Sequence, residues 1–305
     1  MKIPKRPSVL DTTMPAFDMF GGLTSLELEA DAYDLGEGLR IAKTYGHVMA
    51  PFTMAFKRPA EYDRPHPGLW KSMGGGFAYD IEAELNIPAA LTQGKHAQME
   101  IGRAVLFLIR LGVDVSVRLP AFANHSFSEM ANVPDHLSWL RPFDFEARYF
   151  PLDSQIEKFD QARATWVAER WQTVLRLSER DASFLLAREA LDRAQFVQST
   201  ELTLVSVWAA LEALFSPSTS ELKFRVSALI AAFLEPPGED RLMLQRRIAK
   251  LYDKRSAAAH GKPTHDDEHL LESINLLGTV LRKMIDQGNV PSKEALERAL
   301  FGAPT

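Results

Sequence analysis

Apolar and polar residues alternate at several places in the first half of the chain. The clearest stretch runs from Phe77 to Leu85, where apolar residues at every second position are separated by Asp80, Glu82 and Glu84. This two-residue period predicts a strand with one buried face and one polar face. Shorter stretches of the same kind lie at 26–30, 113–117 and 143–149. We expect each of them to form a strand.

The same half contains one helical segment and several glycine-rich turns. Residues from about 95 to 111 have the apolar spacing of a helix. The Gly74–Gly76 run is expected to be a turn, because it lacks the Lys-Ser/Thr of a phosphate-binding loop and precedes a strand. Together these elements predict an α+β domain with a mostly antiparallel sheet over residues 1–151.

Beyond Pro151 the apolar residues recur at three and four positions, and long stretches contain no proline or glycine. This pattern is typical of amphipathic helices in a bundle. We expect helices at about 154–177, 180–196, 199–216, 219–234, 239–254, 264–286 and 292–301. Ser218 or Thr219 is expected to cap the fourth of them. Residues 152–305 are therefore predicted to form an all-α domain.

Composition narrows the class of protein. The 305 residues are 46% hydrophobic and 25% charged, as in ordinary soluble proteins, and the net charge is −5. The absence of cysteine excludes disulfides, thiolate zinc sites and cysteine nucleophiles. The N-terminus has no apolar run of the kind found in a secretory signal. The most apolar helical run, 104–109, is far shorter than the ~20 residues that a membrane span needs. We expect a cytoplasmic protein without membrane contact.

Arg255 and His260 are the candidate catalytic residues. A guanidinium binds the anionic oxygens of a phosphate in a planar fork, and an imidazole moves protons near neutral pH. Together they are the groups that metal-free cleavage of RNA needs, so neither a metal nor another cofactor is expected. Chance supplies an Arg and a His at this spacing easily, so the interpretation depends on the surrounding residues.

Glu212 is the only charged residue between Leu202 and Phe215, in an otherwise apolar helix. Burying a carboxylate is costly unless it is paired and hydrogen-bonded. Arg255 is a suitable partner, and the pair would fix the guanidinium in one orientation. The alternative is that Glu212 lies on a thin polar stripe that faces solvent.

The helices before His260 carry a local excess of positive charge. Between Thr219 and Lys262 there are nine basic and five acidic residues, in a chain of net charge −5. This excess favours a surface that contacts phosphates, although a solvated helix face is the usual explanation for such charge. The residues expected to contact RNA are Lys223, Arg225, Lys250, Lys254 and Lys262.

The order of these residues resembles the HEPN superfamily, the nucleotide-binding domains of higher eukaryotes and prokaryotes, and most closely its Apea-like branch. The resemblance covers about residues 180–287. It is carried by Glu212 in an apolar helix, Lys223-x-Arg225 on the next helix, and then Tyr252-x-x-Arg255-Ser256-x-x-x-His260-Gly261. Ser256 stands where the superfamily often has Asn, Asp or His. Lys262 stands where some toxins of the superfamily carry a tyrosine that an antitoxin modifies, so we do not expect that regulation here.

The resemblance implies a helical bundle that dimerises and places two Arg255–His260 pairs in one cleft, supported by Glu212, Tyr252 and Ser256. It also implies a metal-independent endoribonuclease, in anti-phage defence or in a toxin–antitoxin pair with its own partner protein. Some members of the superfamily have no nuclease activity. A silent RNA- or nucleotide-binding module and a helical dimerisation scaffold are therefore the alternatives.

A second candidate site contains His265 and His269, four residues apart on one helix face, which is a spacing that suits a metal ion. A helix start explains these residues better. Thr264 is expected to cap the helix, and Asp267, three residues later, is expected to make the reciprocal contact of a capping box. We therefore predict no metal site.

Overall fold

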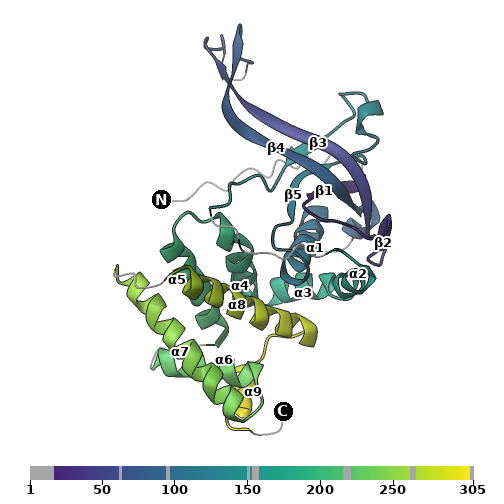
Figure 1. Ribbon diagram of the computed structural model, residues 1–305. Helices are drawn as coiled ribbons and strands as arrows, with labels where there is room; N and C mark the ends of the chain where they lie inside the picture. The colour runs from purple at the N-terminus through teal and green to yellow at the C-terminus, as the bar shows by residue number, and fades with distance from the viewer. Residues whose placement is uncertain are drawn as a thin grey trace.

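A six-stranded sheet forms one end of the molecule (Figure 1). The computed structural model describes residues 17–61, 64–93, 97–149, 152, 158–215, 221–261 and 266–302. The strands are β1 (Met19–Thr24), β2 (Ala32–Asp34), β3 (Arg40–Ala55), β4 (Trp70–Ile87), β5 (Arg118–Ala123) and β6 (Leu140–Pro142). They lie in the order β2-β3-β4-β1-β5-β6, and every neighbouring pair is antiparallel. The expected α+β class with an antiparallel sheet is confirmed.

β4 contains the stretch whose alternation predicted a strand. Its apolar residues Ile81, Ala83 and Leu85 have no exposed surface. Glu84 departs from the expected polar face, because it is only 8% exposed. Its carboxylate accepts hydrogen bonds from the Ser126 hydroxyl at 2.8 Å and from the Phe127 N–H at 2.9 Å. The segment after β5 therefore covers the second face of the sheet at this point.

The prediction of three shorter strands from alternation is wrong. Within the described residues, segment 26–30 makes one isolated bridge, between Leu28 and Phe159. Residues 113–117 form a turn before β5, in which the Asp114 carboxylate accepts a hydrogen bond from the Ser116 N–H at 2.6 Å. Residues 143–149 follow β6 in an irregular path. Side chains hold this path in place, since the Arg148 guanidinium donates to the Ser116 carbonyl at 2.6 Å.

The Gly74–Gly76 run lies inside β4 and is not the predicted turn. Gly75 and Gly76 have φ angles of 109° and 110°, which side chains disfavour. A Cβ atom on Gly76 would also lie 2.3 Å from the Ala50 carbonyl oxygen. These glycines therefore permit an irregular, close pairing with β3, whose register shifts between Pro51 and Thr53. The chain reverses instead between the end of β3 and the start of β4.

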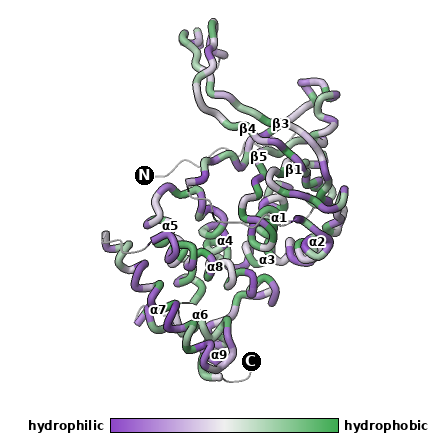
Figure 2. The backbone as a smooth tube through the Cα atoms, viewed as in Figure 1, coloured by the Kyte–Doolittle hydropathy of each residue, from purple (hydrophilic) through white to green (hydrophobic). Residues whose placement is uncertain are grey.

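The outer parts of β3 and β4 extend from the body as a two-stranded arm (Figures 1 and 2). Large apolar side chains are exposed along both strands and at the ends next to them: Met49, Phe52, Met54, Phe56, Leu69, Trp70 and Met73. An isolated two-stranded hairpin is marginally stable in water, and exposed apolar patches of this kind are unusual on monomers.

The helices pack against the sheet and against one another. Their bounds are α1 (Gln98–Gly112), α2 (Gln161–Ala168), α3 (Trp171–Arg180), α4 (Ala182–Arg193), α5 (Thr200–Phe215), α6 (Leu222–Leu234), α7 (Glu239–Ala259), α8 (Asp267–Gln287) and α9 (Lys293–Leu300). α1 contacts β4 and also α2, α3 and α4. One hydrophobic core therefore continues from the sheet through α1 into the helical half. None of the described helices combines the length and apolarity needed to cross a lipid bilayer.

The helices of the second half follow the sequence pattern with two differences. The expected helix 154–177 is divided into α2 and α3, and its first residues lie outside the described part of the chain. At the break, Arg170 binds Asp286 at 2.6 Å and the Trp171 indole donates to the Leu35 carbonyl at 3.1 Å. α7 continues to Ala259, five residues past its expected end. The proposed caps Ser218 and Thr219 lie outside the described residues.

Candidate functional site

Glu212 and Arg255 form an ion pair between two packed helices. α5 is buried along most of its surface, with Leu204, Trp208 and Leu211 fully enclosed. α7 packs against it, and the Arg255 Nη2 lies 3.0 Å from Glu212 Oε1 and 3.1 Å from Oε2. The two side chains are 21% and 19% exposed. The pairing expected from a lone carboxylate in an apolar helix is therefore present, and the solvent-facing alternative is excluded.

Tyr252 completes this cluster from the preceding turn of α7. Its hydroxyl donates a hydrogen bond to Glu212 Oε1 at 2.9 Å, and the Arg255 guanidinium lies 5.4 Å from its ring centre. Burial raises the pKa of Tyr252, and the hydrogen bond to Glu212 raises it further, while Arg255 lowers it. Glu212 thus receives two donors, and its carboxylate orients both side chains of α7.

The floor of the cluster is made by residues that the sequence did not single out. The Trp208 indole packs edge-on against Tyr252 at 5.3 Å and donates a hydrogen bond to the Ser273 hydroxyl at 3.1 Å. Ser273 is fully buried on α8 and donates in turn to the His269 carbonyl at 2.9 Å. A lone serine among the apolar positions of α8 was the only signal for this contact.

Arg255 keeps donors for a ligand. Its bonds to Glu212 use only Nη2, and within the described part of the chain its Nη1 group has no hydrogen-bond partner. The Nε atom is buried and also unpartnered there. With Nε buried and Nη2 bound to Glu212, the Nη1 group remains as the donor for a phosphate oxygen, in a direction that the ion pair fixes.

His260 lies apart from this cluster in a single chain. It follows the last residue of α7, is exposed, and donates its backbone N–H to the Ser256 carbonyl at 3.2 Å. Gly261 ends the helix with a φ of 69°, where glycine is favoured. At 3.6 residues per turn, a residue five positions after Arg255 lies about 140° around the helix axis and about 7.5 Å along it. The described residues show no contact between the two side chains, and a common phosphate for Arg255 and His260 stays a prediction.

The expected RNA-contacting residues divide into three groups. Arg225 and Lys250 are exposed on α6 and α7, and Lys254 is partly exposed. Lys223 is engaged, because its ammonium lies 2.6 Å from the Asp253 carboxylate. Lys262 lies outside the described residues. Between Lys223 and Arg225, Phe224 is 62% exposed, and it borders an open hollow of about 580 Å³ with Gln245 and Ala249.

The second candidate site is a helix start, as expected, but with a different capping residue. Asp266 caps α8, accepting a hydrogen bond from the His269 N–H at 3.0 Å, and it also contacts the His269 ring. Both hydrogen bonds to His269 lower the pKa of Asp266. His265 and Thr264 lie outside the described residues. Across the described ranges, no three metal-binding side chains gather to form a site.

Comparisons with protein-family models, curated proteins and solved structures found no match to the chain. The site is therefore interpreted from its own chemistry. It holds a carboxylate-oriented guanidinium with free donors, a histidine at the end of the same helix, and exposed cations with one exposed aromatic ring on α6 and α7. These groups suit a phosphate-bearing polymer.

Proposed function

We propose that this chain is a metal-independent endoribonuclease of the HEPN type. The observation that carries the proposal is the Glu212–Arg255 pair, which fixes a half-buried guanidinium with unused donors one turn before His260. A carboxylate that orients an arginine for phosphate is a reason for placing Glu212 in a helix that is otherwise apolar. The contacts among Glu212, Tyr252 and Arg255 support the roles that the resemblance implies for these three residues.

The chemistry assigned to these residues needs no metal. The 2′-hydroxyl of RNA attacks the adjacent phosphorus, so a new P–O bond forms while the bond to the 5′-oxygen breaks. One His260 imidazole takes the proton from the 2′-hydroxyl, and another gives a proton to the leaving 5′-oxygen. Arg255 neutralises the charge that develops on the phosphorane oxygens. The products are a 2′,3′-cyclic phosphate and a 5′-hydroxyl.

Two chains are needed to assemble this site. The reaction needs a base and an acid, and each chain has one His260. A symmetric dimer in which the α7 ends meet would bring both Arg255–His260 pairs into one cleft, around one phosphate. The acid and the base would then come from different protomers.

The α6–α7 face is assigned to the RNA strand. Arg225, Lys250 and Lys254 supply positive charge, and the exposed Phe224 ring offers a surface on which an unpaired base can stack. A role in anti-phage defence or in a toxin–antitoxin pair, with a partner protein, stays a prediction from the resemblance.

Cleavage of RNA in EDTA tests the proposal. We expect single-stranded RNA to be cut with cyclic-phosphate ends and DNA of the same sequence to remain intact. Arg255→Ala and His260→Ala should each remove activity. Arg180→Ala changes an exposed arginine at the end of α3 and serves as the charge-matched control. Cleavage that persists in both site variants would overturn the proposal.

The exposed Phe224 ring beside Arg225 favours a second candidate, an RNA-binding module without nuclease activity, because a stacking ring and a cation bind RNA without taking part in cleavage. It predicts that RNA binds to the wild-type protein and is not cut at any protein concentration. A helical scaffold is the remaining alternative, and it predicts neither binding nor cleavage. Mixing the wild type with an excess of His260→Ala protein separates the candidates further, because a cleft that needs both histidines loses its activity in every heterodimer.

A further inference from the structure

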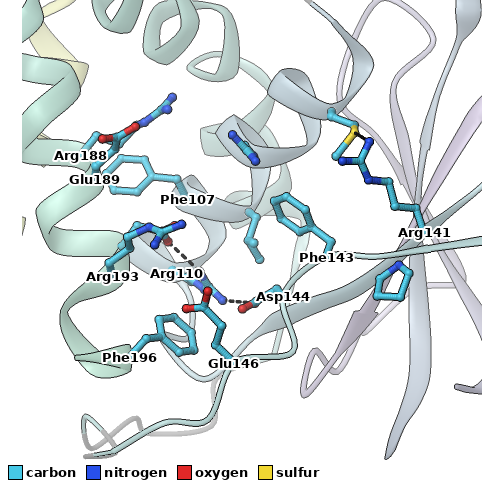
Figure 3. A pocket seen from close by; sticks show the side chains of 15 residues that line it. Phe107, Arg110, Arg141, Phe143, Asp144, Glu146, Arg188, Glu189, Arg193 and Phe196 are labelled. Carbon is cyan, nitrogen blue, oxygen red and sulfur yellow. Dashed lines mark hydrogen bonds and ion pairs between the residues drawn. The ribbon is translucent and has the colours of Figure 1, made fainter. Parts of the chain in front are cut away.

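A polar cavity lies where the sheet half and the helical half of the chain meet (Figure 3). Its volume is about 290 Å³, and its walls come from α1, from α4 and from the segment around β6. This volume is at the lower end of the ≈300–1,000 Å³ range of small-molecule sites. The cavity uses none of the residues of the Glu212–Arg255 cluster.

Arg110 at the base of the cavity is fully engaged. It contacts Asp144 and binds Asp192 at 2.7 Å, and its Nε donates to the Val117 carbonyl at 2.9 Å. Burial lowers the pKa of Arg110, but Asp192 and Asp144 together raise it above its usual value. The charge of Arg110 is therefore balanced by Asp144 and Asp192. A ligand in the cavity would be bound by the other charged residues of its lining.

Four more arginines line the cavity, against two remaining carboxylates that are both exposed: Arg103, Arg141, Arg188 and Arg193, and Glu146 and Glu189. Arg188 is the unusual one. It is 8% exposed, and within the described residues it makes no hydrogen bond and no ion pair. Glu100, Asp192 and Glu189 lie near enough to favour its charged form, but none of them accepts a hydrogen bond from it, so its donors remain for an anionic ligand.

Two arginines outside the lining, Arg118 and Arg148, lie next to the cavity. Arg110, Arg118 and Arg148 surround the Phe196 ring at 5.4 to 5.8 Å. Burial, together with the charges of Arg118 and Arg110, lowers the pKa of Arg148 to about 10. Burial likewise lowers the pKa of Arg188. Adding a negative group here would relieve this repulsion.

The walls also suit an organic group. Phe107, Phe143 and Phe196 line the cavity, and the Arg103 guanidinium lies 5.0 Å from the Phe143 ring centre. Figure 3 shows Arg193 and Phe196 on one side and Phe143 on the other. A flat ring placed between these side chains would meet apolar surface, while its anionic group faced the arginines.

We propose that this cavity binds a small phosphate monoester with a flat organic group, of the size of a nucleoside monophosphate. Arg188 is the buried anchor for the phosphate, and Arg141 and Arg193 supply the charge at the mouth. A dianionic phosphate can bind several cations at once, whereas a single carboxylate carries only one negative charge. Because the ligand sits between α1 and α4, its binding also ties the sheet half to the helical half.

Titration calorimetry on the full chain tests this site without any RNA. The probes are adenosine monophosphate, inorganic phosphate and, as the uncharged control, adenosine. We expect both phosphates to bind and adenosine not to bind. Arg188→Met should weaken binding of adenosine monophosphate at least tenfold, and the unliganded variant should be as stable as the wild type or more stable, because an unpaired buried charge is removed.

Arg180→Met removes the same charge from an exposed site on α3 and should bind like the wild type. If Arg188→Met does not fold, the exposed Arg141→Met replaces it, with a several-fold loss of affinity expected. The proposal is overturned if the wild type binds neither phosphate, if adenosine binds as tightly as its monophosphate, or if the arginine variants keep full affinity.

Discussion

The Arg110 guanidinium on α1 donates a 2.7 Å hydrogen bond to Asp192 on α4, and so connects the sheet half of the chain to the helical half. Its other end contacts Asp144, which is 10% exposed beside an arginine that is 6% exposed. Buried charges of this kind persist only when each has its partner. Arg110 is therefore a structural centre of the interface between the two halves.

Replacing Arg110 by methionine should destabilise the protein by about 3 kcal/mol, because Asp144 would remain buried without a partner. Asp192→Asn should cost less, about 1 kcal/mol, since Asp192 is 34% exposed and Arg110 would keep Asp144. Urea unfolding followed by circular dichroism measures both. Equal effects of the two substitutions would contradict the assignment of Asp144 as the buried member.

Two helical glycines should respond to alanine in opposite directions. At Gly102 on α1 a Cβ would lie 2.8 Å from the buried Phe122 ring, whereas at Gly278 on α8 the nearest atom is a leucine methyl at 3.6 Å. Gly102→Ala should therefore destabilise the protein by about 1–3 kcal/mol through overpacking. Gly278→Ala should stabilise it by up to about 1 kcal/mol through helix propensity. Unfolding midpoints of the two variants give the comparison directly.

Removing the Tyr252 hydroxyl isolates its hydrogen bond to Glu212. Tyr252→Phe should cost about 0.5–1.5 kcal/mol, and Glu212→Ala more, about 1–3 kcal/mol, because Arg255 then loses its carboxylate. In RNA cleavage, Glu212→Ala should lower the rate while Tyr252→Phe keeps most of it. An unchanged rate in Glu212→Ala would mean that the orientation of Arg255 has no part in the reaction.

The same hydroxyl predicts a pH dependence. Burial and the hydrogen bond to Glu212 raise the pKa of Tyr252 above its ordinary value. A raised folded-state pKa means that the stabilisation is fully present below about pH 10, the pKa of an unfolded tyrosine, and is lost as the pH rises through the folded-state value. The stability difference between the wild type and Tyr252→Phe should therefore shrink above pH 10. A constant difference from pH 8 to pH 11 would contradict this.

The helical half followed the sequence closely because its signals are local. The period of three to four apolar residues predicts each helix. Glu212 predicted an ion-pair partner, because a carboxylate in an apolar helix is costly to bury unpaired. The strands of the first half depend on pairing across distant residues. Val113 to Val117 alternate as a strand would, yet Asp114 turns the chain there by bonding the Ser116 N–H. Alternation alone does not record such a contact.

The site was predicted only in part for the same reason. The expected end of the helix at 254 left Arg255 outside it, whereas α7 continues to Ala259 and so holds Arg255 against α5, with His260 after its last residue. The cavity at Arg188 has no sequence signature, because its arginines come from three separate segments and its carboxylates are divided between α4 and the stretch after β6. Phe224 was overlooked because its exposure depends on how α6 packs.

The arm formed by β3 and β4 should be separable from the fold. Ala50 and Phe77 are paired across the strands, so residues 51–76 can be replaced by an Asn-Gly turn. Among the described residues, every large apolar side chain that this removes, from Phe52 to Met73, is exposed, so the free energy of unfolding should change by less than about 1 kcal/mol. Urea unfolding tests this. Acrylamide quenching of tryptophan fluorescence is a second check, because the accessible Trp70 that contributes in the wild type is absent from the deletion variant. A loss of several kcal/mol would mean that the arm packs against the body.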